Sequence, residues 1–259
     1  MIDFELIIAS IQHYIPTFPL IVVVVKYKIF FSELKKISWY IVFSVAVHIV
    51  TTWLTLLGKN NLFLVHIYVV GSFILLARYY GAILTELIHN KWIITIMVVF
   101  TILAILNARY LQPLDTLPTY TLLLSSVVIL TFIFLSIYER HNRLMPKKFI
   151  NGLHYARNRV PYFFINTGLN IFYTVSIPVL ICVDLALKKY LPPDSTLKFW
   201  TAYRCLIIIL NVFLGIGLLK YKRKNMYTSS GDSLYGISVY NPIKPTEEEE
   251  DDDDDDESE

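Results

Sequence analysis

Charged residues are scarce in this sequence, and this scarcity excludes an ordinary soluble domain. Aspartate, glutamate, lysine and arginine make up 17% of the 259 residues, whereas soluble domains carry about 25%. Hydrophobic residues make up 55% of the chain, and the mean hydropathy is +0.54. Aromatic residues, at 15%, suit the belts that tyrosine and tryptophan form at membrane surfaces. The composition is that of an integral membrane protein.

Several chemical signatures are also missing, which limits the functions that the sequence supports. The two cysteines, Cys182 and Cys205, are too few for a disulfide framework and lack metal-ligand spacing. We expect buried free thiols, with a facing pair near the outer surface as the alternative. No H-E-x-x-H, G-x-S-x-G or glycine-rich phosphate loop occurs, and the last apolar segment lacks a central lysine for a retinal Schiff base. We therefore predict no catalytic residue, metal, cofactor or nucleic-acid partner, and do not expect an enzyme.

Seven apolar segments are long enough to cross a membrane, because a spanning helix needs about 20 mostly apolar residues. The segments are 6–25, 37–58, 61–84, 92–108, 116–138, 160–183 and 199–219. Their apolar character is continuous, whereas a transmembrane barrel strand alternates over about 10 residues. We predict an all-α, polytopic bundle of seven transmembrane helices in the lipid bilayer.

Lysine and arginine are distributed unevenly between the two sets of loops. One set carries fifteen of them and the other set carries five. Because positively charged loops stay in the cytoplasm, we predict that the N-terminus lies outside the cell membrane and the C-terminus inside. The longest basic loop, 139–159, is expected to lie on anionic lipid or, alternatively, to bind a cytoplasmic partner.

The chain is predicted to consist of two parts of opposite charge. Residues 1–224 form the transmembrane domain, and residues 225–259 form an acidic cytoplasmic tail with thirteen carboxylates and one lysine. Blocks of like charge repel themselves and stay disordered. We expect a solvating terminus, with the attraction of divalent cations, a basic partner or the basic loops as the alternative.

Five polar residues are predicted to lie in the outer half of the bundle. They are His13, His66, Asn107, Asp184 and Arg204. Ionisable groups inside a membrane are costly and are therefore candidates for function, so these residues predict an outward-facing ligand site. Arg204 and Asp184 are expected to pair at the outer rim. The alternatives are helix caps, interhelical contacts, and an arginine that extends to the lipid headgroups.

Four further polar residues are predicted to make contacts between helices. They are His48, Arg78, Asn166 and Asn170. Asn166 and Asn170 share one helix face, and we expect them to bond Arg78 or Tyr79. His48 lies near the middle of its segment, and no segment offers an acidic partner at that depth, which argues against a proton pump.

Three short stretches carry a family resemblance. Residues 60–68 (NNLFLVHIY), 119–126 (TYTLLLSS) and 161–168 (PYFFINTG) resemble the third, fifth and sixth helices of an uncharacterised family of bacterial seven-helix membrane proteins, which has the pattern N-x-(P)-L-x-H-I-Y in its third helix. Gly71 and Ser72 stand where that family usually has a glutamate, and a glutamate common in its fifth helix is also absent. Because family members often accompany sensor kinases, the resemblance implies a sensory or accessory role.

These observations favour a receptor-like or sensory-accessory protein of the cell membrane. It would bind a ligand through its outer half and a cytoplasmic signalling protein through the basic loop and the acidic tail. The alternative is a small-molecule or ion transporter, which requires broken helices near the midplane; Pro16, Pro19 and Pro178 are the candidates for such breaks. The sequence leaves a homo-oligomer open and identifies neither ligand nor partner.

Overall fold

The computed structural model describes residues 4–84, 87–142, 159–187, 190 and 192–221. The chain divides into two units, Met1–Arg223 and Lys224–Glu259, and the described residues all belong to the first. Within these ranges the chain forms helices and no strand. The elements are α1 (Phe4–Tyr14), α2 (Thr17–Lys26), the 3-10 turn η1 (Tyr27–Ile29), α3 (Ser32–Leu56), α4 (Leu62–Ile83), α5 (Asn90–Leu106), the π-turn η2 (Asn107–Leu111), α6 (Thr119–Asn142), α8 (Arg159–Leu187) and α9 (Pro193–Leu219).

Seven helical spans are long and apolar enough to cross a membrane, which confirms the predicted all-α bundle. The spans are Ile7–Ile29, Ser32–Leu56, Leu62–Ile83, Asn90–Leu111, Thr119–Glu139, Val160–Ala186 and Leu197–Leu219. The first span combines α1, α2 and η1, and the fourth combines α5 and η2. Most of the predicted basic loop, together with the acidic tail, lies outside the described residues.

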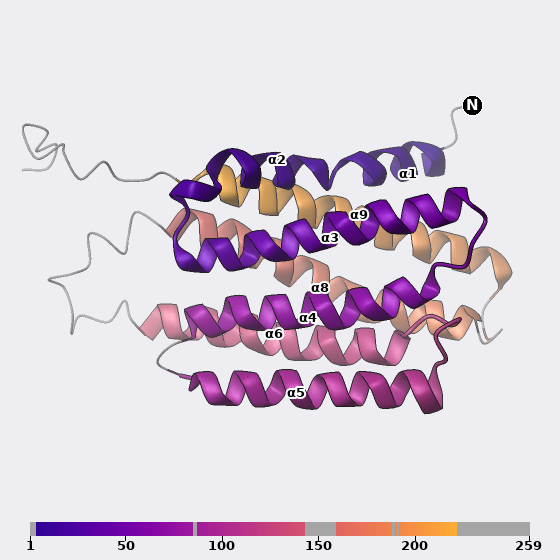
Figure 1. Cartoon of the computed structure of the whole chain (residues 1–259). Helices are drawn as coiled ribbons and strands as arrows, with labels where there is room; N and C mark the ends of the chain where they lie inside the picture. The colour runs from indigo at the N-terminus through magenta and orange to yellow at the C-terminus, as the bar shows by residue number, and fades with distance from the viewer. Residues whose placement is uncertain (1–3, 85–86, 143–158, 188–189, 191, 222–259) are drawn as a thin grey trace, which may run out of the picture. The chain divides into compact units, whose positions relative to one another are not determined.

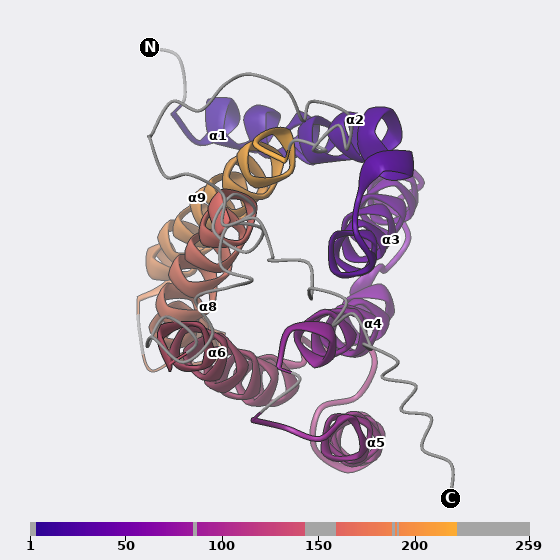
Figure 2. The same cartoon turned by 90° about the vertical axis from the view of Figure 1, so that its left-hand side faces the viewer.

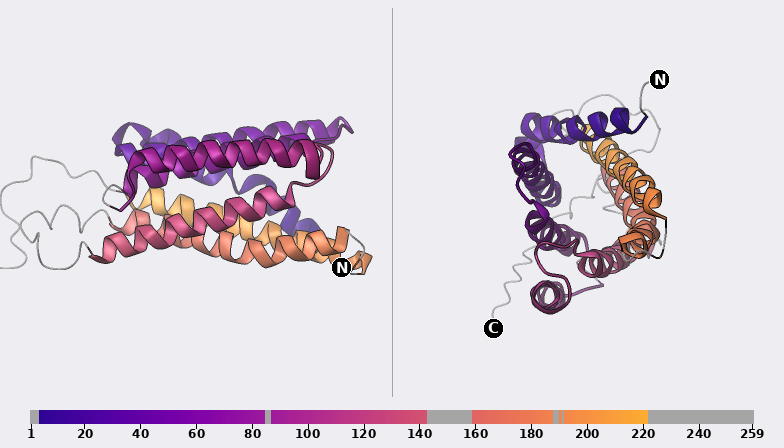
Figure 3. Two further views of the ribbon diagram at one scale, coloured as in Figure 1. Left: turned by 90° about the horizontal axis from the view of Figure 1, so that it is seen from below. Right: turned by 90° about the vertical axis from the view of Figure 1, so that its right-hand side faces the viewer.

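Six of the spans form a closed ring, and α5 lies outside it. Around the ring, α1 and α2 pack on α9, α9 on α8, α8 on α6, α6 on α4, α4 on α3, and α3 on α2. Figure 2 shows this ring along the helix axes, and Figure 3 shows it from the opposite end. α5 packs on the outer side of α4, with a smaller contact to α6. Side chains of six spans therefore surround one common interior.

The bundle has two ends, which Figure 1 shows on its left and right sides. The helices α2, α4, α6 and α9 finish at one end, the Lys26 end, and α3, α5 and α8 finish at the other, the Gly58 end. Gly58 closes α3 in a Schellman motif, in which the Lys59 N–H donates to the Leu54 carbonyl and the Gly58 N–H to the Thr55 carbonyl, each at 3.0 Å. The φ of +65° at Gly58 is the left-handed conformation that glycine adopts most readily.

The first span is interrupted between Tyr14 and Thr17. Pro16 has no backbone N–H and cannot continue the hydrogen-bond ladder of a helix. The Thr17 hydroxyl donates to the Tyr14 carbonyl at 2.6 Å, which satisfies one of the acceptors that the break leaves open. The span therefore divides into α1 and α2 beside the interior of the ring.

Lys26 joins the end of the first span to the end of the last one. Its Nζ donates to the carbonyl of Leu219 at 2.6 Å and to that of Tyr221 at 3.2 Å. The last carbonyls of a helix have no partner within the helix and carry partial negative charge, so an ammonium group stabilises this terminus. The contact holds α2 against α9 where the ring closes.

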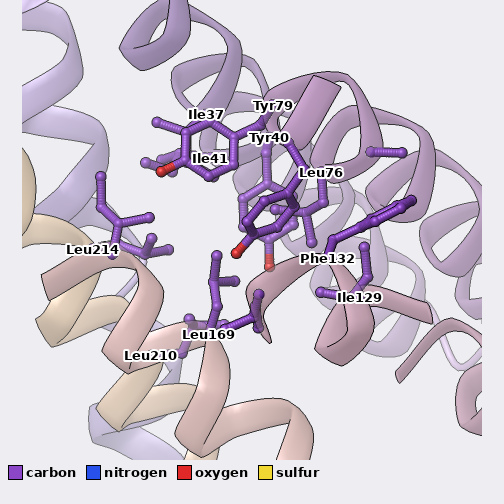
Figure 4. Close-up of a cluster of buried hydrophobic side chains, with 14 of the residues drawn as sticks. Ile37, Tyr40, Ile41, Leu76, Tyr79, Ile129, Phe132, Leu169, Leu210 and Leu214 are labelled. Carbon is purple, nitrogen blue, oxygen red and sulfur yellow. The ribbon is translucent and has the colours of Figure 1, made fainter. Parts of the chain in front are cut away.

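A cluster of buried apolar side chains packs between the helices (Figure 4). Figure 4 labels members from five helices, with Ile37 and Ile41 from α3, Leu76 from α4, and further residues from α6, α8 and α9. These further residues are Ile129, Phe132, Leu169, Leu210 and Leu214. Ile41, Leu210 and Leu214 also line the cavity described below, so the cluster borders the open space within the ring.

Candidate functional site

The ring encloses a cavity of about 220 Å³. Its described lining comes from the α1–α2 junction, α3, α4, the start of α6, α8 and α9, and includes no residue of α5. Most lining residues of α3, α4 and α8 belong to the half of their helix nearer the Gly58 end. Ligand pockets in helical proteins commonly form between the helices of a bundle, so this cavity is the candidate site.

One wall of the cavity is a polar stripe on α3. Tyr40, Ser44, His48 and Thr51 all line the cavity, because positions three or four residues apart lie on one face of a helix. Tyr68 of α4 adds a hydroxyl, which lies 3.5 Å from the Tyr40 hydroxyl and 3.4 Å from the Ser44 hydroxyl. Hydroxyl–hydroxyl hydrogen bonds are usually about 2.7–2.8 Å long. These three groups are therefore close together but only weakly bonded to one another.

His48 contributes a nitrogen whose bonding capacity is not used by the described residues. Its Nε2 is buried and has no hydrogen-bond partner within the described part of the chain. The His48 ring lies beside the ring of His13 on α1, with 5.2 Å between the ring centroids. His48, which the sequence predicted as an interhelical contact, therefore lies at the cavity and beside a second helix.

The opposite wall is apolar and aromatic, and it belongs to α8 and α9. Phe172 and Trp200 flank Tyr203, with ring-centroid distances of 5.8 Å and 5.9 Å. Aliphatic side chains of α9 continue this wall. Asn211 is its polar exception, and the Asn211 Nδ2 donates to the Ile207 carbonyl of its own helix at 2.8 Å. The cavity thus has one hydrogen-bonding side and one apolar side.

The charge of the lining limits what the cavity can bind. No aspartate, glutamate, lysine or arginine occurs among the described residues that line it. An ionised group that leaves water needs a counter-charge or several strong hydrogen bonds. The described lining supplies no counter-charge, so it suits an uncharged molecule.

The five residues predicted to bind a ligand are not at this cavity. His13, His66, Asn107, Asp184 and Arg204 are all absent from its described lining. His66 is buried at 8% exposure, and its Nε2 lies 3.0 Å from the carbonyl of Thr116. His66 therefore ties α4 to the segment before α6, which corresponds to the interhelical alternative.

Asn107 and Asp184 belong instead to a buried polar network, the Gln112 network, at the Gly58 end. The Asn107 Nδ2 donates to the Gln112 Oε1 at 3.0 Å and to the Thr121 Oγ1 at 2.9 Å. The Gln112 Nε2 donates to the Thr119 Oγ1 at 2.6 Å, and the Thr119 hydroxyl donates to Asp184 at 3.2 Å. The network connects η2, α6 and α8, so these residues hold helices together.

The predicted Arg204–Asp184 ion pair is not formed between these two residues, both of which are described. The described partner of the Asp184 carboxylate on another helix is Thr119. Cys182 and Cys205 are free thiols, half-buried in α8 and α9. Of the five predicted ligand residues, the structure brings Asn107 and Asp184 together in the Gln112 network.

Among the predicted interhelical residues, Asn166 makes the most extensive contacts. It accepts a hydrogen bond from the Tyr80 hydroxyl at 3.3 Å and donates to the Ser136 hydroxyl at 3.2 Å, and thereby connects α4, α6 and α8. The expected partners, Arg78 and Tyr79, are not the ones that Asn166 uses. Arg78 is exposed, and Asn170 accepts from Thr174 of its own helix at 3.2 Å.

The residues that the sequence analysis missed are the uncharged polar ones of the cavity. Tyr40, Ser44 and Tyr68 carry no charge, so a search for ionisable groups in the membrane passes over them. A usable signal is nevertheless present, because Tyr40, Ser44, His48 and Thr51 recur every three or four residues through an apolar helix. A polar stripe within an apolar segment indicates a shared interior.

The fold and the cavity together describe a multi-pass, seven-helix membrane protein with one cavity lined by six of its spans. Comparison with known proteins adds no family to this description, since no family model, curated protein or solved structure matches the chain.

Proposed function

We propose that this protein is a receptor-like or sensory-accessory membrane protein that binds a small molecule in the cavity. The observation that carries this proposal is that six spans line one common cavity. A ligand in such a space contacts several helices at once and therefore favours one packing of the helices over others. The proposal assigns no reaction to the protein.

The ends of the helices give a route from the cavity to a partner. Leu214 of α9 lines the cavity, and one turn later α9 ends at Leu219, whose carbonyl accepts a hydrogen bond from Lys26. Pro16, at the break in the first span, also lines the cavity. A change in the position of α9 or of the break would thus reach the Lys26 end, where the loops carry most of the basic residues.

The proposal places the Lys26 end in the cytoplasm and the protein in the cell membrane. Its support is the excess of lysine and arginine in the loops at that end. In a background with both native cysteines replaced by alanine, K59C should react with a membrane-impermeant maleimide in intact cells. K28C should react only after permeabilisation, because Lys28 lies at the Lys26 end. Lys28 and Lys59 are both exposed. The reverse labelling pattern would overturn the orientation.

The cytoplasmic partner is proposed to bind the basic segment 139–159 and the acidic tail. Quantitative affinity purification from native membranes should enrich a cytoplasmic protein with the full chain and lose it with a chain that ends at Lys224. A matched control keeps the length of the tail but replaces its carboxylates by amides, which separates charge from length. If the full chain and the shortened chain purify with the same set of proteins, the tail is not a docking element.

Transport is the second candidate, and the break between α1 and α2 is the observation that favours it. Interrupted helices that line a cavity are a recurrent feature of transporters, and Pro16 is at such a position. The lack of charged side chains in the described lining does not suit an ion. Ion flux into proteoliposomes should therefore equal the flux into empty vesicles, and a clear excess would favour transport.

A further inference from the structure

We infer that the cavity binds a small, uncharged aromatic molecule that carries a hydroxyl group. Its ring would pack on the aromatic wall of α8 and α9, and its hydroxyl would bond the polar stripe of α3 together with Tyr68. This inference rests on the proposed function, since it names the class of ligand for the same cavity.

Size is the first constraint on the ligand. A buried cavity of about 150 Å³ admits benzene, and this cavity has about 220 Å³. The additional space is sufficient for one or two small substituents on a single ring. Larger ligands such as a lipid chain or a nucleotide would extend beyond this volume.

The aromatic wall is the second constraint. Tyr203 is held between Phe172 and Trp200 by ring contacts, so this surface has a fixed orientation. Aromatic rings attract each other in offset or edge-to-face arrangements, which contribute about 0.5–1.5 kcal/mol beyond the buried area. A flat ring therefore complements this wall better than an aliphatic chain does.

The polar stripe is the third constraint, because its hydrogen bonds are incomplete. The hydroxyl of Tyr68 makes only long contacts, of 3.5 Å to Tyr40 and 3.4 Å to Ser44. The buried Nε2 of His48 has no partner within the described residues. Buried polar groups without full hydrogen bonds are costly. A ligand hydroxyl, which both donates and accepts, would complete these bonds, and a purely apolar ligand would leave them incomplete.

The absence of charge in the described lining is the fourth constraint. An ionised carboxylate or ammonium would lose its hydration shell without gaining a counter-charge. Charged analogues of the same size and shape should therefore bind much more weakly. The four constraints together favour a substituted phenol over a hydrocarbon, a carboxylate or an amine.

The test uses three toluenes that differ in the group opposite the methyl: 4-methylphenol and 1,4-dimethylbenzene, which share one shape, and the charged 4-methylbenzoate. Each is titrated into the full chain in lipid nanodiscs, and binding is followed by the fluorescence of Trp200, which lines the cavity. Nanodiscs without protein correct for partition into lipid, and a Trp200→Phe variant gives the background signal of the other tryptophans. We expect 4-methylphenol to bind about tenfold more tightly than 1,4-dimethylbenzene, as one or two added hydrogen bonds predict, and 4-methylbenzoate not to bind.

Tyr68→Phe should remove most of the preference for the phenol and leave the affinity for 1,4-dimethylbenzene unchanged. Phenylalanine keeps the ring stacked on Phe43, where the interplanar angle is 4°, so the fold should be retained. Tyr110→Phe is the matched control, because Tyr110 is exposed and lies outside the cavity. Ser44→Leu, which fills the space, should abolish binding of both uncharged probes without lowering the melting temperature.

The outcomes separate this inference from the proposed function. Equal affinity for the two uncharged probes, with no effect of Tyr68→Phe, would overturn the hydroxyl preference while the cavity remained a binding site. Comparable binding of 4-methylbenzoate would overturn the requirement for an uncharged ligand. Failure of all three probes to bind would overturn both the inference and the binding role of the cavity.

Discussion

Replacing Gly217 by valine should lower the free energy of unfolding by about 3 kcal/mol, near the upper end of the usual cost of inserting extra atoms into a packed interior. A Cβ atom at this position of α9 would stand 2.9 Å from the Cγ1 of Ile165 and 2.9 Å from the carbonyl oxygen of Pro161. Ile165 is fully buried, and as a β-branched residue in a helix it is largely restricted to one χ1 rotamer. A backbone carbonyl of α8 cannot move without displacing the helix. The two γ-methyl groups of valine increase the overlap.

The loss of stability is large because α8 and α9 pack closely at Gly217. Helices in lipid associate through close van der Waals packing, and small residues at the interface allow their backbones to approach. Filling the position forces the helices apart and disrupts the neighbouring contacts as well. The measurement is reversible unfolding in mixed detergent micelles, followed by tryptophan fluorescence.

Ala202→Val is the control for this substitution, because it introduces the same β-branched side chain at an exposed position of the same helix. Gly217→Ala should give an intermediate loss, since it adds the Cβ atom alone. Equal stability of Gly217→Val and Ala202→Val would show that α8 and α9 are not in close contact at Gly217.

The spans themselves could be predicted from the sequence because one physical requirement dominates in lipid. A spanning segment must be apolar and must satisfy its own backbone hydrogen bonds, so continuous apolar runs identify helices directly. The ends were less accurate. The fourth span continues through the π-turn of Asn107–Leu111. Asn107 and Gln112 are polar and therefore suggest a loop, but their side chains are satisfied by hydrogen bonds within the fold.

The cavity could not be predicted because it depends on which helices are neighbours. Tyr40 and Tyr68 approach each other only when α3 and α4 pack together at one particular rotation. Ionisable groups are the most conspicuous polar residues of an apolar segment, and they indicate Arg204 and Asp184, which do not line the cavity. The tyrosines gave no such signal, because tyrosine is also typical of the membrane surface. The sequence does not show which face of each helix points into the bundle.

Replacing Gln112 by leucine should lower the free energy of unfolding by about 2 kcal/mol, because leaving buried polar groups unpaired costs about 1–3 kcal/mol. The Gln112 side chain accepts from the Asn107 amide and from the Tyr120 backbone N–H, at 3.0 Å and 3.1 Å, and donates to Thr119 at 2.6 Å. Leucine removes all three bonds. Single interhelical hydrogen bonds in membranes contribute only about 0.6 kcal/mol on average, so the predicted loss requires that the three bonds act together.

Two threonine variants separate this cooperative loss from the general effect of removing a polar group. Thr121→Val removes one acceptor of the Gln112 network and should cost clearly less than Gln112→Leu. Thr131→Val makes the same chemical change at an exposed position of α6, where the hydroxyl bonds only its own helix at Val127, and should have little effect. If all three variants unfold at the same denaturant concentration, the network contributes nothing beyond ordinary contacts.

The same Gln112→Leu variant distinguishes a structural network from a ligand site. Asn107 and Asp184 are predicted ligand residues, yet their described contacts are with neighbouring helices. If the network only holds η2, α6 and α8 together, the folded variant should bind 4-methylphenol with unchanged affinity even though it unfolds more easily. A loss of affinity at a temperature where the variant is fully folded would instead make the network part of the binding site, because a merely structural contact changes the amount of folded protein and not the affinity of each folded molecule.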